Sequence, residues 1–214
     1  MARHQGIPIR FVAAPARRSS ALDYETRIAT CGEIETRDDD PHDLANAFVW
    51  LVFPRTKAAL NAVHARDGRA TSANARSRAR DAATLIDESG LLFACANREL
   101  VALLRARRWR ELFATRRDEV AADVRAVAVG HGLLVKLRAP YRALTAHALI
   151  VDPAIDSRDD SAIDRAAAQL IGSPGFAPET LVPLPVAALP GWDTEGLGRA
   201  LFDDVSVFRT AVLG

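Results

Sequence analysis

The chain has 214 residues, of which 49% are hydrophobic and 26% are charged. This composition is typical of a globular protein and excludes intrinsic disorder, which goes with a less apolar chain. The formal net charge of +1 excludes the overall attraction to nucleic acid or anionic membranes that strongly basic domains have. A chain of this length buries a substantial core without metal or disulfides, so a single globular domain is expected.

The N-terminal segment carries no recognisable secretory signal. Pro8 and Pro15 interrupt any helix in residues 1–22, so we expect an irregular arm there. Without such a signal the two cysteines, Cys31 and Cys95, are expected to be free thiols. These features predict a cytoplasmic protein.

The longest uninterrupted apolar run, residues 47–53, is far shorter than the roughly 18 residues that suggest a membrane helix. No membrane partner is therefore expected. The near-neutral charge makes nucleic acid an unfavoured partner. Other partners are unknown, and homo-oligomerisation is left open.

In chain order, the first predicted elements form a helical hairpin. Asp40 has the position of a helix cap, and a helix is predicted from there to about residue 52. Residues 47–52 are apolar nearly all round, which is typical of a buried helix. Pro54 ends this helix and opens a second one, at about 55–65.

Two later segments lack the regular spacing of apolar residues that indicates a helix or a strand. Residues 66–80 are rich in Gly, Ser, Ala and Arg, which predicts an exposed basic loop. Residues 173–192 are rich in proline and are expected to lie along the surface, with 184–186 extended.

A small antiparallel sheet is predicted from short apolar runs. Residues 83–86 and 91–95 flank Asp87-Glu88-Ser89-Gly90, which has the composition of a type I turn closed by glycine. We therefore expect a hairpin at about 83–95, joined by a strand at about 144–151.

The remaining periodic segments favour helices. Asn97 is placed to cap one helix, and apolar residues three and four apart predict another over 118–137. A third helix is expected from Ser161 to Gly172. The fold class is thus α+β, a helix-dominated single domain over 23–214 with a small sheet.

The sequence contains none of the familiar signature motifs, such as a Walker loop, a dinucleotide-binding glycine pattern, a nucleophile elbow or a zinc-binding cysteine pattern. Polar side chains that could carry chemistry instead gather in residues 42–64 and 130–136. The candidate catalytic residues are His42 and His131, and the candidate substrate-binding residues are Asn46, Lys57, Asn61, His64 and Lys136.

His42 and Asn46 are one turn apart on the apolar first helix. Their side chains could point together into a pocket, where the imidazole acts as a base or ligand. The alternative is that both only satisfy backbone groups near a helix end.

His131 has a glycine on each side. Glycine inside a helix costs about 1 kcal/mol relative to alanine, and the close approach of another backbone or of a ligand would justify this cost. A core histidine beside closely packed helices explains the same pattern.

Lys57 and Lys136 are the only lysines among 28 basic residues. Lysine offers a compact charge and a pKa that burial shifts readily, neither of which arginine offers. Asn61 and His64 share a helical face with Lys57. The alternative for His64 is a solvated side chain near the C-terminus of the helix, where the helix dipole favours a histidine.

Asp87 and Glu88 are assigned to the turn of the predicted hairpin, and no catalytic role is given to them. Metal and cofactor requirements are left unknown.

Several segments together resemble a bacterial protein family catalogued as a domain of unknown function, the family numbered 3025. They are HDLANAFVWL at 42–51, FPRTKAALN at 53–61, DESG at 87–90, Gly130-His131, Pro190-Gly191-Trp192 and Phe202-Asp203-Asp204. The resemblance extends from about residue 23 to 209. It implies a single domain and a bacterial source, and it brings no activity, cofactor or catalytic residue.

Two functional hypotheses follow. The first is a hydrolase or lyase in which His131 or His42 transfers protons and Lys57 or Lys136 holds an anionic group. It requires His42 and His131 to meet in one pocket, and a histidine-bound metal is a variant of it. The second is a non-catalytic binding or interaction protein, which requires an exposed apolar patch near residues 173–192. The clustering of polar residues on apolar helices favours the enzyme.

Overall fold

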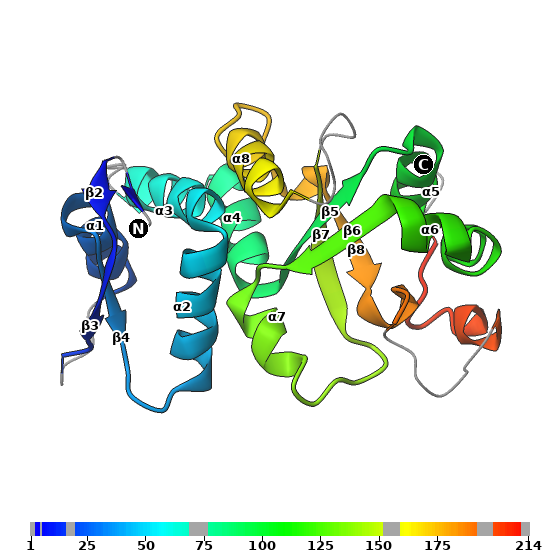
Figure 1. Ribbon diagram of the computed structural model, residues 1–214, viewed down its shortest axis with the longest axis horizontal. Coiled ribbons are helices and arrows are strands. Elements are labelled where there is room, and N and C mark those ends of the chain that lie inside the picture. The colour runs from blue at the N-terminus through cyan, green and yellow to red at the C-terminus, as the bar shows by residue number, and fades with distance from the viewer. Residues whose placement is uncertain are drawn as a thin grey trace.

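The computed structural model describes residues 3–4, 6–15, 20–68, 77–151, 159–191 and 199–210, and the structural statements below concern these residues. Helices predominate, and a four-stranded sheet crosses the middle of the molecule (Figure 1). The predicted α+β class is confirmed. Among the helices described, none is both long enough and apolar enough to cross a membrane.

The central sheet has the strand order β6-β5-β7-β8. Strand β5 pairs with β7 in parallel, whereas the pairs β5–β6 and β7–β8 are antiparallel. The sheet is therefore mixed and not purely antiparallel, although the predicted strand at 144–151 is confirmed. The strands are β5 (Gly90–Cys95), β6 (Val124–Ala128), β7 (Thr145–Val151) and β8 (Leu181–Pro185).

Both faces of the sheet are buried. Along β5, Leu91 and Phe93 belong to one apolar cluster while Leu92 and Ala94 belong to another, because successive side chains point to opposite faces. A strand buried on both faces is apolar throughout, as β5 is. The first face packs against α5 (Arg98–Arg105), a π-helical turn (Glu111–Thr115) and α6 (Arg117–Asp123). The second face packs against α2 (Pro41–Val52), α3 (Pro54–Gly68), α4 (Arg78–Ser89) and α8 (Asp160–Ile171).

The two helices predicted at about 40–52 and 55–65 are confirmed as α2 (Pro41–Val52) and α3 (Pro54–Gly68), although α3 crosses the end of α2 and does not run back along it (Figure 1). Asp40 caps α2, because its carboxylate accepts hydrogen bonds from the backbone N–H groups of His42 and Asp43, at 2.9 and 3.2 Å. The cap fixes the start of the helix and therefore the position of His42.

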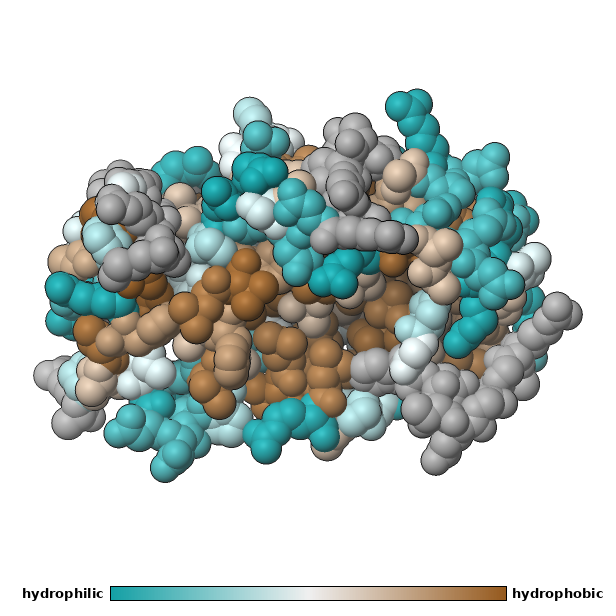
Figure 2. All heavy atoms as spheres, in the orientation of Figure 1, coloured by the Kyte–Doolittle hydropathy of each residue, from teal (hydrophilic) through white to brown (hydrophobic). Residues whose placement is uncertain are grey.

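Helix α2 is buried on one face only, which corrects the expectation of a helix buried all round. Trp50 is 1% exposed, whereas the neighbouring Leu51 is 61% exposed. Leu44 and Phe48 lie on the same open side and are also exposed. Figure 2 shows apolar side chains gathered on this side of the molecule, over α2 and α7 (His131–Lys136).

The N-terminal residues form a small unit at one end of the molecule (Figure 1). Strands β3 (Arg10–Ala13) and β4 (Glu33–Thr36) are parallel and are connected by α1 (Ala21–Cys31). Residues 3–4 and 7–8 form the short antiparallel pair β1 and β2. Part of the arm predicted to be irregular is therefore strand. Ile9, Ile28 and Ile34 of this unit pack with Trp50 of α2.

The predicted hairpin at 83–95 is wrong in its first half. Residues 83–86 belong to α4 (Arg78–Ser89), whose start is capped by Ser77. Ala82, Ala83 and Ile86 are buried on one helical face. A short apolar run does not distinguish helix from strand, and here burial against the sheet favours the helix.

The predicted helix over 118–137 is also wrong. It is divided into α6, strand β6 and α7. The valines of β6 are compatible with both structures, and antiparallel pairing of Ala128 with Leu91 and of Val124 with Cys95 selects the strand.

Parts of two predicted surface segments belong to regular elements. Arg78 and Arg80, assigned to the basic loop, lie on α4, and residues 69–76 of that loop lie outside the described residues. In the Pro-rich segment, Pro183 and Pro185 belong to the edge strand β8, where a missing N–H is tolerated. Leu181, Leu184 and residues 186–188 are buried, so the segment is part of the core here.

The shorter elements complete the described chain. They are the 3-10 turns Pro178–Thr180, Val186–Ala188 and Arg199–Asp203. Trp192, which was assigned to the Pro-rich surface segment, lies outside the described residues.

Candidate functional site

A polar cavity of about 750 Å³ lies where the N-terminal unit, α2, α3 and the α4–α7 junction meet. This volume is within the range of small-molecule sites, about 300 to 1,000 Å³. The polar and aromatic residues lining it include Tyr24, Glu25, His42, Asn46, Trp50, Lys57, Asn61, His64, Asp87, Glu88 and His131.

The cavity brings together most of the residues singled out in the sequence. All of them except Lys136 line it, although they come from three different helices. Lys136 lies at the far end of α7 from His131 and is not among the lining residues described. The requirement that His42 and His131 share a pocket is met.

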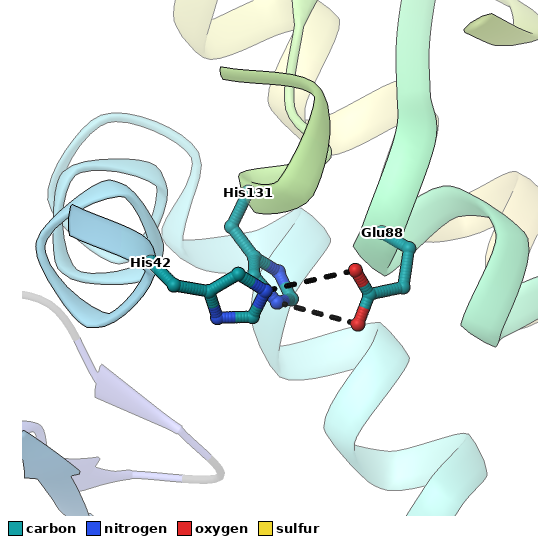
Figure 3. A group of neighbouring side chains, drawn as sticks. All are labelled: His42, Glu88 and His131. Carbon is teal, nitrogen blue, oxygen red and sulfur yellow. Dashed lines mark ion pairs between the residues drawn. The ribbon is translucent and has the colours of Figure 1, made fainter. Parts of the chain in front are cut away.

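His42 and His131 are in direct contact. Their ring centroids are 4.2 Å apart, and the rings are nearly perpendicular. Glu88 faces both imidazoles, with one carboxylate oxygen 3.7 Å from Nε2 of His42 and the other 3.6 Å from Nε2 of His131 (Figure 3). The His131 side chain is 9% exposed, whereas those of His42 and Glu88 are 45% and 54% exposed. The group therefore has a buried side and a side open to solvent.

Three separate elements position this group. His42 is in the first turn of α2, Glu88 is in the last turn of α4, and His131 is the first residue of α7 (Figure 3). The start of α7 is held against the end of α4, because the backbone N–H of Gly130 donates to the carbonyl of Gly90 at 2.9 Å.

The two glycines beside His131 are explained by this close approach. A Cβ atom at Gly130 would lie 2.3 Å from the backbone nitrogen of Gly90. A Cβ atom at Gly132 would lie 2.7 Å from a carboxylate oxygen of Glu88 and 2.9 Å from its backbone oxygen. All three distances are too short for a side chain, so glycine at both positions lets His131 approach Glu88.

Behind His131 lies a second carboxylate, that of Asp87. Its Oδ2 atom is 3.8 Å from Nδ1 of His131. This Nδ1 atom is buried and makes no hydrogen bond within the described residues. Burial lowers the pKa of His131 below its ordinary value, although the Asp87 carboxylate opposes that shift.

Asp87 also accepts a hydrogen bond from the ammonium group of Lys57 on α3. Burial raises the pKa of Asp87, but the attraction of Lys57 and of His131 outweighs it, and the pKa lies below its usual value. Asp87 therefore stays ionised between Lys57 and His131. The Lys57 ammonium also lies 5.8 Å from the centroid of the Trp50 ring.

The opposite wall of the cavity comes from α1 and carries Tyr24 and Glu25. Asn61 donates to the Glu25 carboxylate at 2.6 Å, and Asn46 donates to the Tyr24 hydroxyl at 3.0 Å. Burial raises the pKa of Glu25 to about 7, and it raises the pKa of Tyr24 well above its ordinary value. The side-chain oxygens of Asn46 and Asn61 are buried and unpaired among the described residues.

Asp87, Glu88, Tyr24 and Glu25 are among the lining residues that were not selected from the sequence. Asp87 and Glu88 were assigned to a turn, and Tyr24 and Glu25 received no assignment. A helical assignment of 78–89 would have placed Asp87 and Glu88 in its last turn, immediately before the strand. The sequence offers no comparable signal for Tyr24 and Glu25, because their approach depends on how α1 packs on α3.

The arrangement offers two chemical capabilities. Histidines beside carboxylates can accept and return protons. His42, Glu88 and His131 also offer one ligand atom each within 4.8 Å of one another, which is compatible with a metal ion.

The fold and cavity together define an α+β protein with a histidine- and carboxylate-lined pocket. The family model described as "Protein of unknown function (DUF3025)" matches residues 9–211, so the chain belongs to this family. No curated protein and no solved structure matches the chain.

Proposed function

We propose that this chain is an enzyme of the hydrolase or lyase type, with the polar cavity as its active site. The observation that carries the proposal is the meeting of His42, Glu88 and His131 at the cavity wall, with Asp87 behind His131. Perturbed titratable groups gathered in a pocket of this size are typical of active sites.

Burying this set of polar groups lowers the stability of the folded protein, which indicates that the groups have a function. Lys57, Asn61 and His131 are buried polar residues, and three of the buried polar atoms in the site are without a hydrogen-bond partner among the described residues. Each such atom costs roughly 1 to 3 kcal/mol of stability. Proteins retain costs of this kind where chemistry or binding requires them.

The proposed division of roles follows from exposure. His42 and Glu88 face the open side of the cavity, so together with His131 they would act on a bound water molecule or on the substrate. Asp87 is a positioning residue for His131.

Lys57 was expected to hold an anionic group of the substrate. Because its ammonium already binds Asp87, we propose instead that Lys57 keeps Asp87 ionised and in place. Binding of the substrate then falls to other residues that line the cavity, among them Asn46 and Asn61.

The non-catalytic alternative has less support. It requires an exposed apolar patch near residues 173–192, and Leu181, Leu184 and residues 186–188 are buried. The proposed location is the cytoplasm of a bacterium, which two free cysteines, one of them exposed, fit well.

The test is an activity screen of the purified full-length chain. Ester, amide, phosphoester and elimination substrates of small size are assayed with the wild type, His131→Gln and Glu88→Gln, and circular dichroism verifies that each variant is folded. We expect turnover of at least one substrate class, reduced about 100-fold or more in both variants. Absence of turnover across the panel, or turnover that both variants retain, contradicts the proposal.

A further inference from the structure

We propose that His42, Glu88 and His131 bind a single Zn²⁺ ion at the wall of the cavity. The site deepens the proposed function and rests on it for its catalytic role, whereas the binding of metal is a separate claim. Two nitrogen ligands and one carboxylate form a ligand set found in catalytic zinc sites.

The separation of the ligand atoms fits such an ion. A metal about 2.0 to 2.2 Å from each ligand atom places those atoms roughly 3 to 4 Å apart. One oxygen of Glu88 lies 3.7 Å from Nε2 of His42 and the other lies 3.6 Å from Nε2 of His131, and one ligand atom from each residue lies within 4.8 Å of the others. A small closure of the side chains around the ion would complete the site. All three side chains also point to one spot between them (Figure 3).

The fold sets the backbone positions of the three ligands. They come from α2, α4 and α7, which are far apart in the sequence, and glycines at 130 and 132 let His131 and Glu88 approach. A chance group of surface side chains would not need two glycines to form. Preorganised ligands of this kind favour tight binding.

Asp87 supplies the outer partner that metal-bound histidines usually have. A histidine that ligates through Nε2 typically donates its Nδ1 hydrogen to a carboxylate, which fixes the ring and strengthens the ligand. Nδ1 of His131 is buried without a hydrogen bond, and the nearest charged oxygen, on Asp87, is 3.8 Å away. In the zinc-bound protein we expect this gap to shorten to a hydrogen bond.

The charges near the site favour a cation. Lys57 is paired with Asp87, and Arg37 at the same cavity is paired with Asp43. The ion pairs that Glu88 makes within the described residues are with His42 and His131, and these count only when the imidazoles are protonated. A divalent ion would compensate this carboxylate while the imidazoles remain neutral.

Three protein ligands leave a tetrahedral zinc ion one open position. His42 and Glu88 are half exposed, so this position faces the cavity. Zinc-bound water in such sites has a pKa of about 7, so part of it is ionised to hydroxide near neutral pH. The open position would thus supply the nucleophile for hydrolysis. Magnesium is disfavoured because it prefers oxygen ligands.

The decisive experiment measures metal binding and does not require a substrate. Tag-free full-length protein is stripped with chelator, and Zn²⁺ and Mg²⁺ are titrated separately by calorimetry, with stoichiometry from elemental analysis. We expect one Zn²⁺ ion to bind per chain and no measurable binding of Mg²⁺. His42→Ala and His131→Ala should each weaken zinc binding about 100-fold or more, and Asp87→Asn about 10- to 100-fold.

His64→Ala is the matched control, because His64 lines the same cavity outside the ligand set. It should bind zinc like the wild type. X-ray absorption of the zinc-loaded wild type provides a measurement that does not depend on variant folding, and two imidazole ligands are expected. Substoichiometric zinc, affinity unchanged in His42→Ala and His131→Ala, or a spectrum without imidazole overturns the site.

The two proposals fail in different ways. Zinc bound with two imidazole ligands in a protein that turns over no substrate supports the metal site and contradicts the enzyme. Turnover that persists at full rate in the chelator-treated protein, together with no zinc bound on titration, supports the enzyme and contradicts the metal site.

Discussion

The ammonium group of Lys57 on α3 donates a hydrogen bond to the carboxylate of Asp87 at the end of α4, and this ion pair joins the two helices. Both side chains are largely buried, at 6% and 20% exposure. A buried ion pair adds little net stability, but removing one partner leaves an uncompensated charge. The pair therefore predicts a large asymmetry between single and double substitutions.

Lys57→Met should lower the free energy of unfolding by about 3 to 5 kcal/mol, because Asp87 is left ionised and buried. Urea denaturation followed by circular dichroism at neutral pH in the presence of chelator gives the value. The double variant Lys57→Met/Asp87→Leu should recover much of the loss, because neither charge remains. A double variant as unstable as the sum of its single variants would argue against the pairing.

Gly130→Ala should perturb the junction between α4 and α7. Its Cβ would lie 2.3 Å from the backbone nitrogen of Gly90, and backbone cannot move aside as a flexible side chain can. We expect a loss of about 1 to 3 kcal/mol, typical of overpacking, together with weaker zinc binding because His131 shifts away from Glu88. Thermal denaturation and calorimetry measure the two effects.

Gly175→Ala is the control for that substitution, because an added Cβ at Gly175 meets no atom within 4 Å. It should leave both stability and zinc binding close to those of the wild type. Equal effects of the two substitutions would contradict the close approach at Gly130.

Neighbouring residues of α2 should respond very differently to truncation. Trp50→Ala removes a side chain that is 1% exposed and packs with Ile28 and Ile34, so a loss of about 3 to 5 kcal/mol is expected. Leu51→Ala should change the free energy of unfolding by about 0.5 kcal/mol or less, because Leu51 is 61% exposed. Urea denaturation of both variants tests which face of α2 is buried, and comparable losses would show that the assigned face is wrong.

Local signals in the sequence were sufficient for the helices with clear caps and breakers. Asp40, Pro54 and Asn97 each mark a helix that the structure contains. The errors occur where two structures share one apolar pattern. Residues 83–86 are helical and Val124–Ala128 is a strand because of the partners that each finds in space, and pairing with β5 has no local signal.

The candidate site was accessible from the sequence in part. His42, Lys57 and His131 were selected because uncommon polar residues stood among apolar ones, and the fold brings them together. Asp87 and Glu88 were lost through the hairpin assignment. Glu25 reaches the cavity only through the packing of α1 against α3, a contact that nothing near Glu25 in the sequence specifies.

Glu25 should make stability depend on pH. Burial raises its pKa in the folded protein to about 7, from 4.5. The folded state therefore binds this proton more tightly than the unfolded state, so the contribution of Glu25 to the free energy of unfolding is most favourable below pH 4.5. It declines as pH rises from 4.5 to about 7 and is constant above that. The shift corresponds to about 3 kcal/mol.

Glu25→Gln removes the titration while keeping an oxygen that can accept the hydrogen bond from Asn61. At pH 8 the variant should be more stable than the wild type by up to about 3 kcal/mol, and at pH 4.5 the difference should largely vanish. Urea denaturation at a series of pH values measures this difference. Asp38→Asn, at an exposed carboxylate, should differ from the wild type by about 0.5 kcal/mol or less throughout. A stabilisation by Glu25→Gln that is the same at pH 4.5 and pH 8 would mean that Glu25 does not titrate in this range, because only the loss of a buried charge makes the benefit grow with pH.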